Sequence, residues 1–327
     1  MTAALRIEPY GPAWAERWDA FAAPGNNSTI FHSQNFLAYH GSDRASRAAH
    51  LLFLRGESLA AVLPLGLEDG ADRAAVSPFG ASFGGPVLPA GTTYAQASET
   101  AGALVAYARE RGWKSLRITP APAVYHAIPD AYLEFALLKR GFRLIRRELC
   151  QGVLLGPAAA APADPLAGYE YACRKAIRKA EREGVEVRPT EDIDLFHAVL
   201  SESRARLGTR PTHSAAELRD LRERLGDAFV LLGAYREGGL VGGLLGFAAN
   251  ARVFLNFYTC SRAEAREMRV DNLLNHAALG LARARGFRYY DFGTSSIGME
   301  PNEGLIRFKE SFGGGGHFRD TYLWEAP

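Results

Sequence analysis

A lysine among aromatic residues, late in the chain, is the first group whose residue types could carry out chemistry. Lys309 follows Phe308, and Phe312 and a run of glycines come soon after it. An ammonium in such surroundings could stabilise the oxyanion that forms when an attacked carbonyl becomes tetrahedral. A surface lysine on a helix that ends at glycine explains the same pattern. Arginine far outnumbers lysine among the 38 basic residues, so a retained lysine favours a need for a compact ammonium.

The second group is a run of cations between Tyr169 and Gly184. At the helical period, one face of this segment carries cations and the opposite face carries small and apolar side chains. The cations are Arg174, Lys175, Arg178, Lys179 and Arg182, and the other side consists of Cys173, Ala176, Ile177 and Ala180. Such a face could bind the phosphates of a nucleotide, a tRNA or a lipid headgroup. It could equally be a solvated face whose cations pair with glutamates one turn away.

The third group is an acidic residue within an aromatic strand. Asp291 follows two tyrosines and precedes Phe292, a glycine and three hydroxyl residues. A carboxylate at the end of a strand could position or deprotonate an amine. Binding the backbone amides of the following turn is an equally good explanation.

The composition restricts the class of protein. The 327 residues are 47% hydrophobic and 23% charged, with a net charge of +2, which is typical of a soluble globular chain. The sequence contains no run of about 18 apolar residues, so we expect no membrane span. The first residues lack the features of a secretory signal. The 3 cysteines and 8 histidines show no metal-ligand spacing, so we expect no metal and a cytoplasmic location. The sequence also lacks Walker, Rossmann and nucleophile-elbow motifs.

The elements that must position these residues occur twice along the chain. Each half is predicted to contain a hairpin, a helix that ends at a glycine, and a strand directly after it. The helix ends Ala108–Lys114 and Ala282–Arg288 resemble each other in sequence, which indicates a repeat. We therefore expect an α/β (α+β) fold of two similar domains, each a mostly antiparallel mixed sheet flanked by helices. The predicted limits are 1–155 for the first domain, 156–168 for a Pro/Ala linker, and 169–327 for the second domain.

Three motifs together resemble the FemAB-like branch of the GNAT acyltransferase superfamily. They are the basic segment Arg174–Ala180, the strand Tyr290–Gly293, and Gly304–Lys309 with the following Phe312–Gly313. The resemblance is clear over 166–327. It implies two tandem GNAT-like domains and amide formation by direct transfer, without a covalent enzyme intermediate or a metal. Fem ligases transfer an amino acid from aminoacyl-tRNA to an amine, classically on a peptidoglycan precursor.

The resemblance also implies roles for individual residues. Lys309 matches the lysine that neutralises the tetrahedral intermediate, and Asp291 matches an aspartate that we place in the catalytic set without a stated role. The residues expected to shape the donor site are Phe308, Arg307 and Asn272. Those expected to bind a phosphate-bearing substrate are Arg174, Lys175, Arg178 and Lys179.

The identity of the acyl donor depends on one turn. GNAT enzymes that use acyl-CoA hold its pyrophosphate on backbone amides of a glycine-rich turn that opens a helix. The matching stretch Glu267–Asn272 has no glycine, and the charge of Asp271 would repel phosphate. We therefore expect aminoacyl-tRNA as co-substrate, with acyl-CoA as the alternative and no bound cofactor. The acceptor would be a small-molecule or peptidoglycan-type amine, and the enzyme a bacterial monomer. A non-catalytic module that binds tRNA or a phosphoglycan is the alternative of another class.

Overall fold

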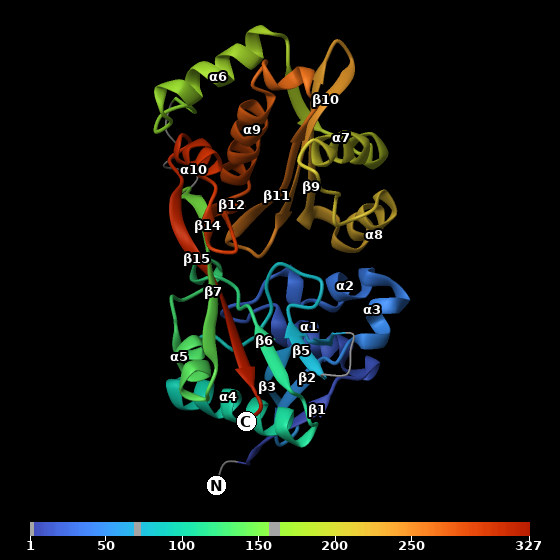
Figure 1. Cartoon of the computed structure of the whole chain (residues 1–327), viewed down its shortest axis with the longest axis vertical. Helices are drawn as coiled ribbons and strands as arrows, with labels where there is room; N and C mark the ends of the chain where they lie inside the picture. The colour runs from blue at the N-terminus through green and yellow to red at the C-terminus, as the bar shows by residue number, and fades with distance from the viewer. Residues whose placement is uncertain (1–2, 69–72, 157–163) are drawn as a thin grey trace. The chain divides into compact units, whose positions relative to one another are not determined.

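The computed structural model describes residues 3–68, 73–156 and 164–327, which divide into two compact units (Figure 1). The first unit consists of Met1–Glu148 and Phe318–Pro327, and the second of Leu149–His317. Two strands have residues in both units, namely β7 (Arg143–Leu154) and β15 (Gly315–Glu325). The chain therefore enters the second unit along β7 and leaves it along β15.

The first unit contains two sheets with helices packed against them. An antiparallel sheet consists of β1 (Leu5–Pro9), β2 (Leu51–Arg55) and β3 (Ser58–Leu63). The other strands follow the order β4 (Gly66–Leu67), β5 (Ala74–Ser77), β6 (Ser115–Ile118) and β15, with β5 and β6 parallel. The helices are α1 (Ala15–Ala22), α2 (Gln34–Leu37), α3 (Gly41–Arg47), α4 (Tyr94–Glu110) and α5 (Tyr132–Lys139). Its main core includes Phe53, Leu104 and Trp324.

The second unit is a mixed sheet with helices on it. The strand order is β7-β12-β11-β10-β9-β8, in which β11 and β12 are parallel and the other neighbours antiparallel. The strands are β8 (Glu186–Pro189), β9 (Phe229–Arg236), β10 (Gly239–Ala248), β11 (Val253–Ser261) and β12 (Tyr289–Thr294), with a separate pair β13 (Ser296–Ile297) and β14 (Glu300–Pro301). The helices are α6 (Tyr171–Arg182), α7 (Ile193–Ala205), α8 (Ala215–Leu225), α9 (Val270–Ala284) and α10 (Glu303–Glu310). Helix α9 packs on the sheet, and α6 packs on α9 (Figure 1).

Both units repeat one order of elements. A hairpin, β2–β3 in the first unit and β9–β10 in the second, precedes a parallel strand pair. Helix α4 connects the parallel strands β5 and β6, as α9 connects β11 and β12. The predicted α/β fold of two similar units is therefore confirmed.

The limits of the two units differ from those predicted from the sequence. The first unit ends at Glu148, ahead of the predicted boundary at 156–168, and Phe318–Pro327 belongs to the first unit and not to the second. The reason is the pairing of β15 with β6, which places Tyr322 opposite Ile118. No local pattern reveals a pairing between segments so far apart in the chain. Residues 157–163 of the predicted linker lie outside the described residues.

The parallel strands β11 and β12 stay paired over a short distance. Pairing joins Val253–Leu255 to Tyr289–Asp291. Strand β11 then continues to Ser261 and β12 to Thr294. Because Asp291 is the last residue of this register, it lies where the two parallel strands part.

Candidate functional site

The Lys309 side chain is buried under the end of β12. It lies in the last turn of α10, which begins where the Asn302 side chain accepts a hydrogen bond from the Leu305 amide. Lys309 is 3% exposed. Its Nζ donates to Gly293 O at 2.7 Å, Thr294 O at 2.8 Å and Ser295 Oγ at 2.8 Å. Since an ammonium has three N–H donors, all of them are used here, and the alternative of a surface lysine is wrong.

Burial also changes the acidity of this ammonium. Desolvation lowers the pKa of Lys309 to about 8, and the nearby Asp291 and Cys150 raise it in part. At neutral pH the protonated form still predominates, so the site keeps a positive charge. Ser295 extends this hydrogen-bond network, because its hydroxyl donates to Gln151 Oε1 at 2.6 Å.

Asp291 is buried beside the same turn. Its Oδ1 accepts a hydrogen bond from the Gly293 amide at 2.6 Å, as the second explanation of the sequence pattern predicts. Gly293 has a φ of 76°, a conformation that favours glycine and bends the chain over the carboxylate. The other oxygen, Oδ2, lies 3.5 Å from His317 Nε2. Asp291 is thus a charge at the centre of a buried network.

His317 is a member of this network that sequence reasoning missed. Its Nδ1 lies 3.1 Å from the Tyr289 hydroxyl. Burial lowers the pKa of His317, but hydrogen bonds to Asp291 and Cys150 outweigh burial and raise the pKa to about 9. A histidine after a glycine run carries no local signal of this role, because the contact arises only when β15 lies next to β7, the strand that pairs with β12.

A second polar group that the sequence did not indicate lies where β11 leaves β12. Asn275 on α9 is fully buried, and its Oδ1 accepts from Asn256 Nδ2 at 2.8 Å and from the Tyr290 hydroxyl at 3.1 Å. Its Nδ2 donates to Asp271 O at 2.8 Å. These bonds attach α9 to both parallel strands.

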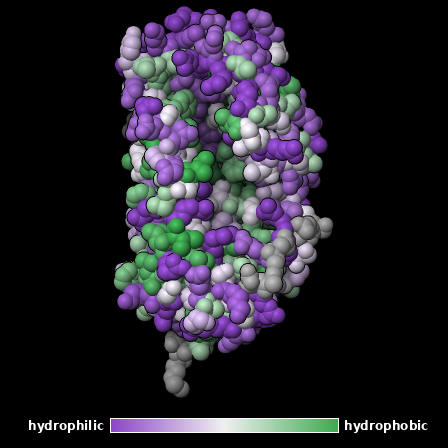
Figure 2. All heavy atoms as spheres, viewed as in Figure 1, coloured by the Kyte–Doolittle hydropathy of each residue, from purple (hydrophilic) through white to green (hydrophobic). Residues whose placement is uncertain are grey.

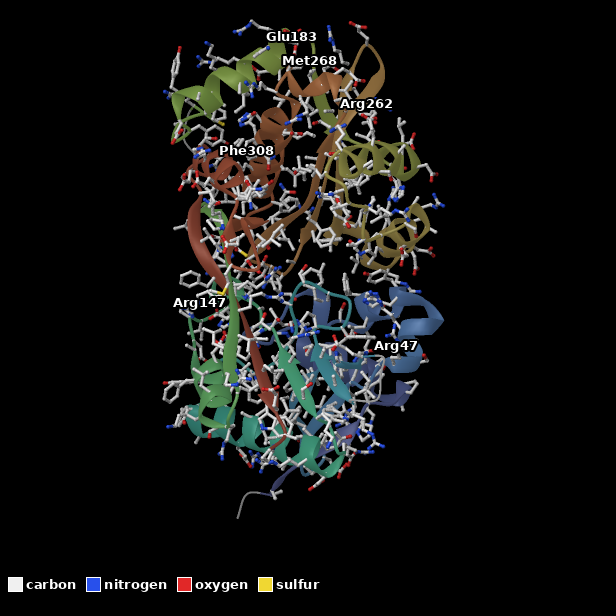
Figure 3. All side chains as sticks on the ribbon, viewed as in Figure 1. Arg47, Arg147, Glu183, Arg262, Met268 and Phe308 are labelled. Atoms are coloured by element: carbon white, nitrogen blue, oxygen red, sulfur yellow. The ribbon has the colours of Figure 1, made fainter. Side chains whose placement is uncertain are left out.

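The predicted donor-site residues have different surroundings. Phe308 is half-buried, and its ring centroid lies 5.3 Å from that of Phe312 (Figure 3). Arg307 is exposed and pairs with Glu303 at 3.2 Å. Asn272 is buried, and its Nδ2 donates to Cys173 Sγ on α6 at 3.8 Å. Asn272 therefore joins two helices, and the three side chains do not share hydrogen-bond partners.

The start of α9 carries a carboxyl group. Burial raises the pKa of Asp271, and a hydrogen bond with Ser261 lowers it in part. Arg269, the residue that precedes the helix, has a φ of 63° and supplies no side-chain cap. The first turn of α9 therefore contains a buried carboxyl group that is bound to Ser261.

The cationic face of α6 has the predicted orientation. Cys173, Ile177 and Ala180 are buried against the core that contains α9. The cations of the other face are Arg174, Lys175, Arg178, Lys179 and Arg182, and none of them forms an ion pair with any residue that the structure describes. The glutamates one turn away, at positions 170, 181 and 183, do not neutralise them. Figure 2 shows mainly hydrophilic residues at the end of the molecule where α6 lies in Figure 1.

Neither a metal-binding cluster nor a membrane-spanning helix occurs in the described part of the chain. No three His, Cys, Asp or Glu side chains within it gather as a metal ion would require. No described helix is both long enough and apolar enough to cross a membrane.

Solved structures share this fold over nearly the whole chain. A structure of FemX is 13% identical, with a TM-score of 0.70, and covers 98% of this chain and 97% of its own. A tandem GNAT protein from the clavulanic acid biosynthesis pathway is 17% identical, with a TM-score of 0.58 and 99% coverage of both chains. The C-terminal domain of a putative lysylphosphatidylglycerol synthetase from Agrobacterium fabrum is 13% identical, with a TM-score of 0.61, and covers 95% of this chain and 92% of its own. The fold is that of tandem GNAT proteins.

The family model supplies the class of enzyme. Residues 168–309, which lie within the second unit, match the acetyltransferase (GNAT) domain. No curated protein matches the chain significantly. The chain therefore contains an acetyltransferase (GNAT) domain in its second unit, which is the domain of an acyltransferase.

Proposed function

We propose that this acyltransferase forms an amide by transferring an aminoacyl group from aminoacyl-tRNA to an acceptor amine. The observation that carries the proposal is the cationic face of α6, whose five cations have no ion-pair partner among the described residues. Cations left free in this way suit the closely spaced phosphates of a nucleic acid. The stretch Glu267–Asn272, which has no glycine to hold a pyrophosphate on backbone amides, supports the choice of tRNA over acyl-CoA.

The reaction is a direct displacement. The neutral amine attacks the ester carbonyl of the aminoacyl-tRNA, so that a C–N bond forms and the carbonyl oxygen becomes an oxyanion. The intermediate then collapses, the C–O ester bond breaks, and the tRNA hydroxyl leaves with the proton that the amine gives up. Lys309 supplies the positive charge for the oxyanion. One of its N–H groups turns to the oxyanion from its present acceptor at Gly293, Thr294 or Ser295.

The other residues of the network act on Lys309 and its loop. Asp291 holds the turn at Gly293 through the amide bond at 2.6 Å, and its charge favours the protonated form of Lys309. Phe308 and Arg307 would line the aminoacyl side, and Arg174, Lys175, Arg178 and Lys179 would hold the tRNA phosphates. The acceptor is a small-molecule or peptidoglycan-type amine. Because aminoacyl-tRNA is made in the cytoplasm, the proposal places a monomeric bacterial enzyme there.

A panel of donors tests the proposal. Mixed aminoacyl-tRNA and acyl-CoA are each offered with an amine extract of bacterial cells, and the products are identified by mass. We expect an amide product from aminoacyl-tRNA that disappears after RNase treatment. Product that persists after RNase, or that requires acyl-CoA, would reject the tRNA donor in favour of acyl-CoA, which the match to an acetyltransferase domain supports.

A single substitution tests the role of Lys309. We expect Lys309→Met to lower turnover by about 10²–10³, which is the usual loss when one oxyanion donor is removed. Lys114→Met is the matched control, because Lys114 is exposed in the first unit. Unchanged turnover in Lys309→Met would contradict the assignment. Salt-dependent tRNA binding without product from any donor would instead favour the non-catalytic module.

A further inference from the structure

Helix α5 of the first unit is apolar on two sides. Leu133, Ala136 and Leu137 are buried in the core of that unit. Tyr132, Phe135 and Leu138 follow one another at a spacing of three residues and point to solvent. A surface helix normally carries polar side chains on its outer face.

Neighbouring residues extend this exposed apolar surface. The Tyr94 ring at the start of α4 lies 5.6 Å from the Phe135 ring and 6.1 Å from the Tyr132 ring, measured between centroids. Ile128 lies in the segment that leads into α5. We call these residues the α5 face, and each is between 38% and 54% exposed: Tyr94, Ile128, Tyr132, Phe135 and Leu138.

Cations border the α5 face. Residues 139–147 contain five basic residues and no acidic one, and Leu144 and Ile145 are exposed among them. Lys139 has no ion-pair partner among the described residues, and Arg140 binds the neutral Ser98. The other three arginines do have partners: Arg143 pairs with Glu325, Arg146 with Glu148 and Arg147 with Asp320. The rim next to α5 therefore keeps a positive charge.

The acidic residue of α5 offsets this charge only in part. Burial raises the pKa of Glu134 to about 7, and the charges of Asp130 and Asp320 raise it further. At neutral pH this carboxyl group is therefore about half protonated, and it is turned inward. Figure 2 shows apolar residues beside hydrophilic ones on the side where α5 and β7 lie in Figure 1.

We propose that the α5 face docks on the surface of an anionic lipid bilayer. Tyrosine and phenylalanine rings suit the boundary between headgroups and acyl chains, and Lys139 and Arg140 suit the lipid phosphates. A second copy of the chain fits less well, because a two-fold interface would bring the same cations against each other. The proposal concerns the first unit and does not depend on the acyl donor or on Lys309.

Vesicle co-sedimentation of the full chain tests the proposal. The probes are vesicles of phosphatidylcholine with phosphatidylglycerol and vesicles of phosphatidylcholine alone. We expect binding to the anionic vesicles that weakens as salt is added. Phe135→Ser should lower the partition coefficient about tenfold. Lys139→Gln should lower it about fivefold on anionic vesicles and little on neutral ones.

Matched controls keep the test specific. Leu207→Ser removes an exposed leucine of the second unit, and Lys114→Gln removes an exposed lysine away from the α5 face. Both should bind as the unchanged chain does, and all variants should keep its unfolding midpoint. Equal binding of Phe135→Ser, or no binding to either vesicle, would overturn the proposal. A concentration-dependent dimer that Phe135→Ser abolishes, without vesicle binding, would assign the face to a second copy.

Discussion

At the scale of single residues, the buried charges at the end of β12 depend on one another. Lys309 satisfies its three donors on the turn after β12, and Asp291 accepts from the same turn. A buried charge is tolerated only with such partners. Asp291 raises the pKa of both Lys309 and His317, so one carboxylate supports two cations.

The protonation of His317 gives this coupling a pH dependence. Its pKa rises from 6.5 to about 9 in the folded chain. Protonated His317 therefore adds stability that is fully present below pH 6.5 and is lost as the pH rises through 9. We expect His317→Gln to lower the free energy of unfolding most below pH 6.5, with the difference shrinking toward pH 9 in urea titrations. Asp291→Asn should remove the same pH-dependent part of the free energy of unfolding. A loss of stability in His317→Gln that is equal at every pH would contradict the coupling.

At the scale of elements, the buried face and the exposed face of α6 have different roles, because side chains alternate between the two faces at the helical period. Its buried side chains join the core with α9, and its outer face carries the free cations. Changes on the outer face should therefore alter binding and leave the fold unchanged. Substitutions on this face therefore allow nucleic-acid binding to be tested independently of transfer activity.

Under the proposed function, the salt dependence of tRNA binding measures the phosphate contacts of α6. Each cation that contacts a phosphate adds about one to the slope of log K against log salt. We expect the double variant Lys175→Gln, Arg178→Gln to reduce this slope by about two, measured by filter binding over a range of salt. Lys114→Gln is the control and should leave the slope unchanged. An unchanged slope in the double variant would place the tRNA elsewhere.

The contact of β7 with β12 leaves no room for a side chain at Gly152. A Cβ there would lie 2.3 Å from Tyr289 Cε1 and 2.5 Å from the Tyr290 carbonyl oxygen. Gly152 is paired with Asp291, so a shift would reach the site. We expect Gly152→Ala to lower the free energy of unfolding by about 1–3 kcal/mol, as measured by urea unfolding. On α9, an added Cβ at Gly280 would meet no atom within 4 Å, so Gly280→Ala should raise the free energy of unfolding by about 0.5–1 kcal/mol.

At the scale of the whole molecule, each unit has its own hydrophobic core. Trp324 on β15 is buried in the core of the first unit, and Phe254 on β11 in that of the second. The last residues of the chain therefore stabilise the unit that begins it.

Two core substitutions should act on different units. We expect Trp324→Ala to cost about 3–5 kcal/mol and to speed hydrogen exchange in α4 and β6. Phe254→Ala should speed hydrogen exchange in α9 and β12 instead. Exchange that rises in all four elements for either variant would show that the two cores unfold as one.

The sequence predicted the helices and strands better than it predicted which strands pair and which buried side chains meet. The hairpins, the helices that end at glycine and the amphipathic α6 depend on neighbours within a few residues, and the structure confirms them. The limits of the units were wrong, because β15 returns to pair with β6. For Asp291, the turn amide was among the predicted partners, whereas His317 was not.

What the sequence determined by itself was therefore local: the repeat of elements, the cationic face of α6 and the acidic start of α9. Only the tertiary structure decided that Lys309 is buried with all its donors occupied, and that His317 lies against Asp291. The physical reason is that the desolvation and charge pairing of a side chain depend on segments far away in the chain. These segments meet only when β15 has taken its place beside the earlier strands.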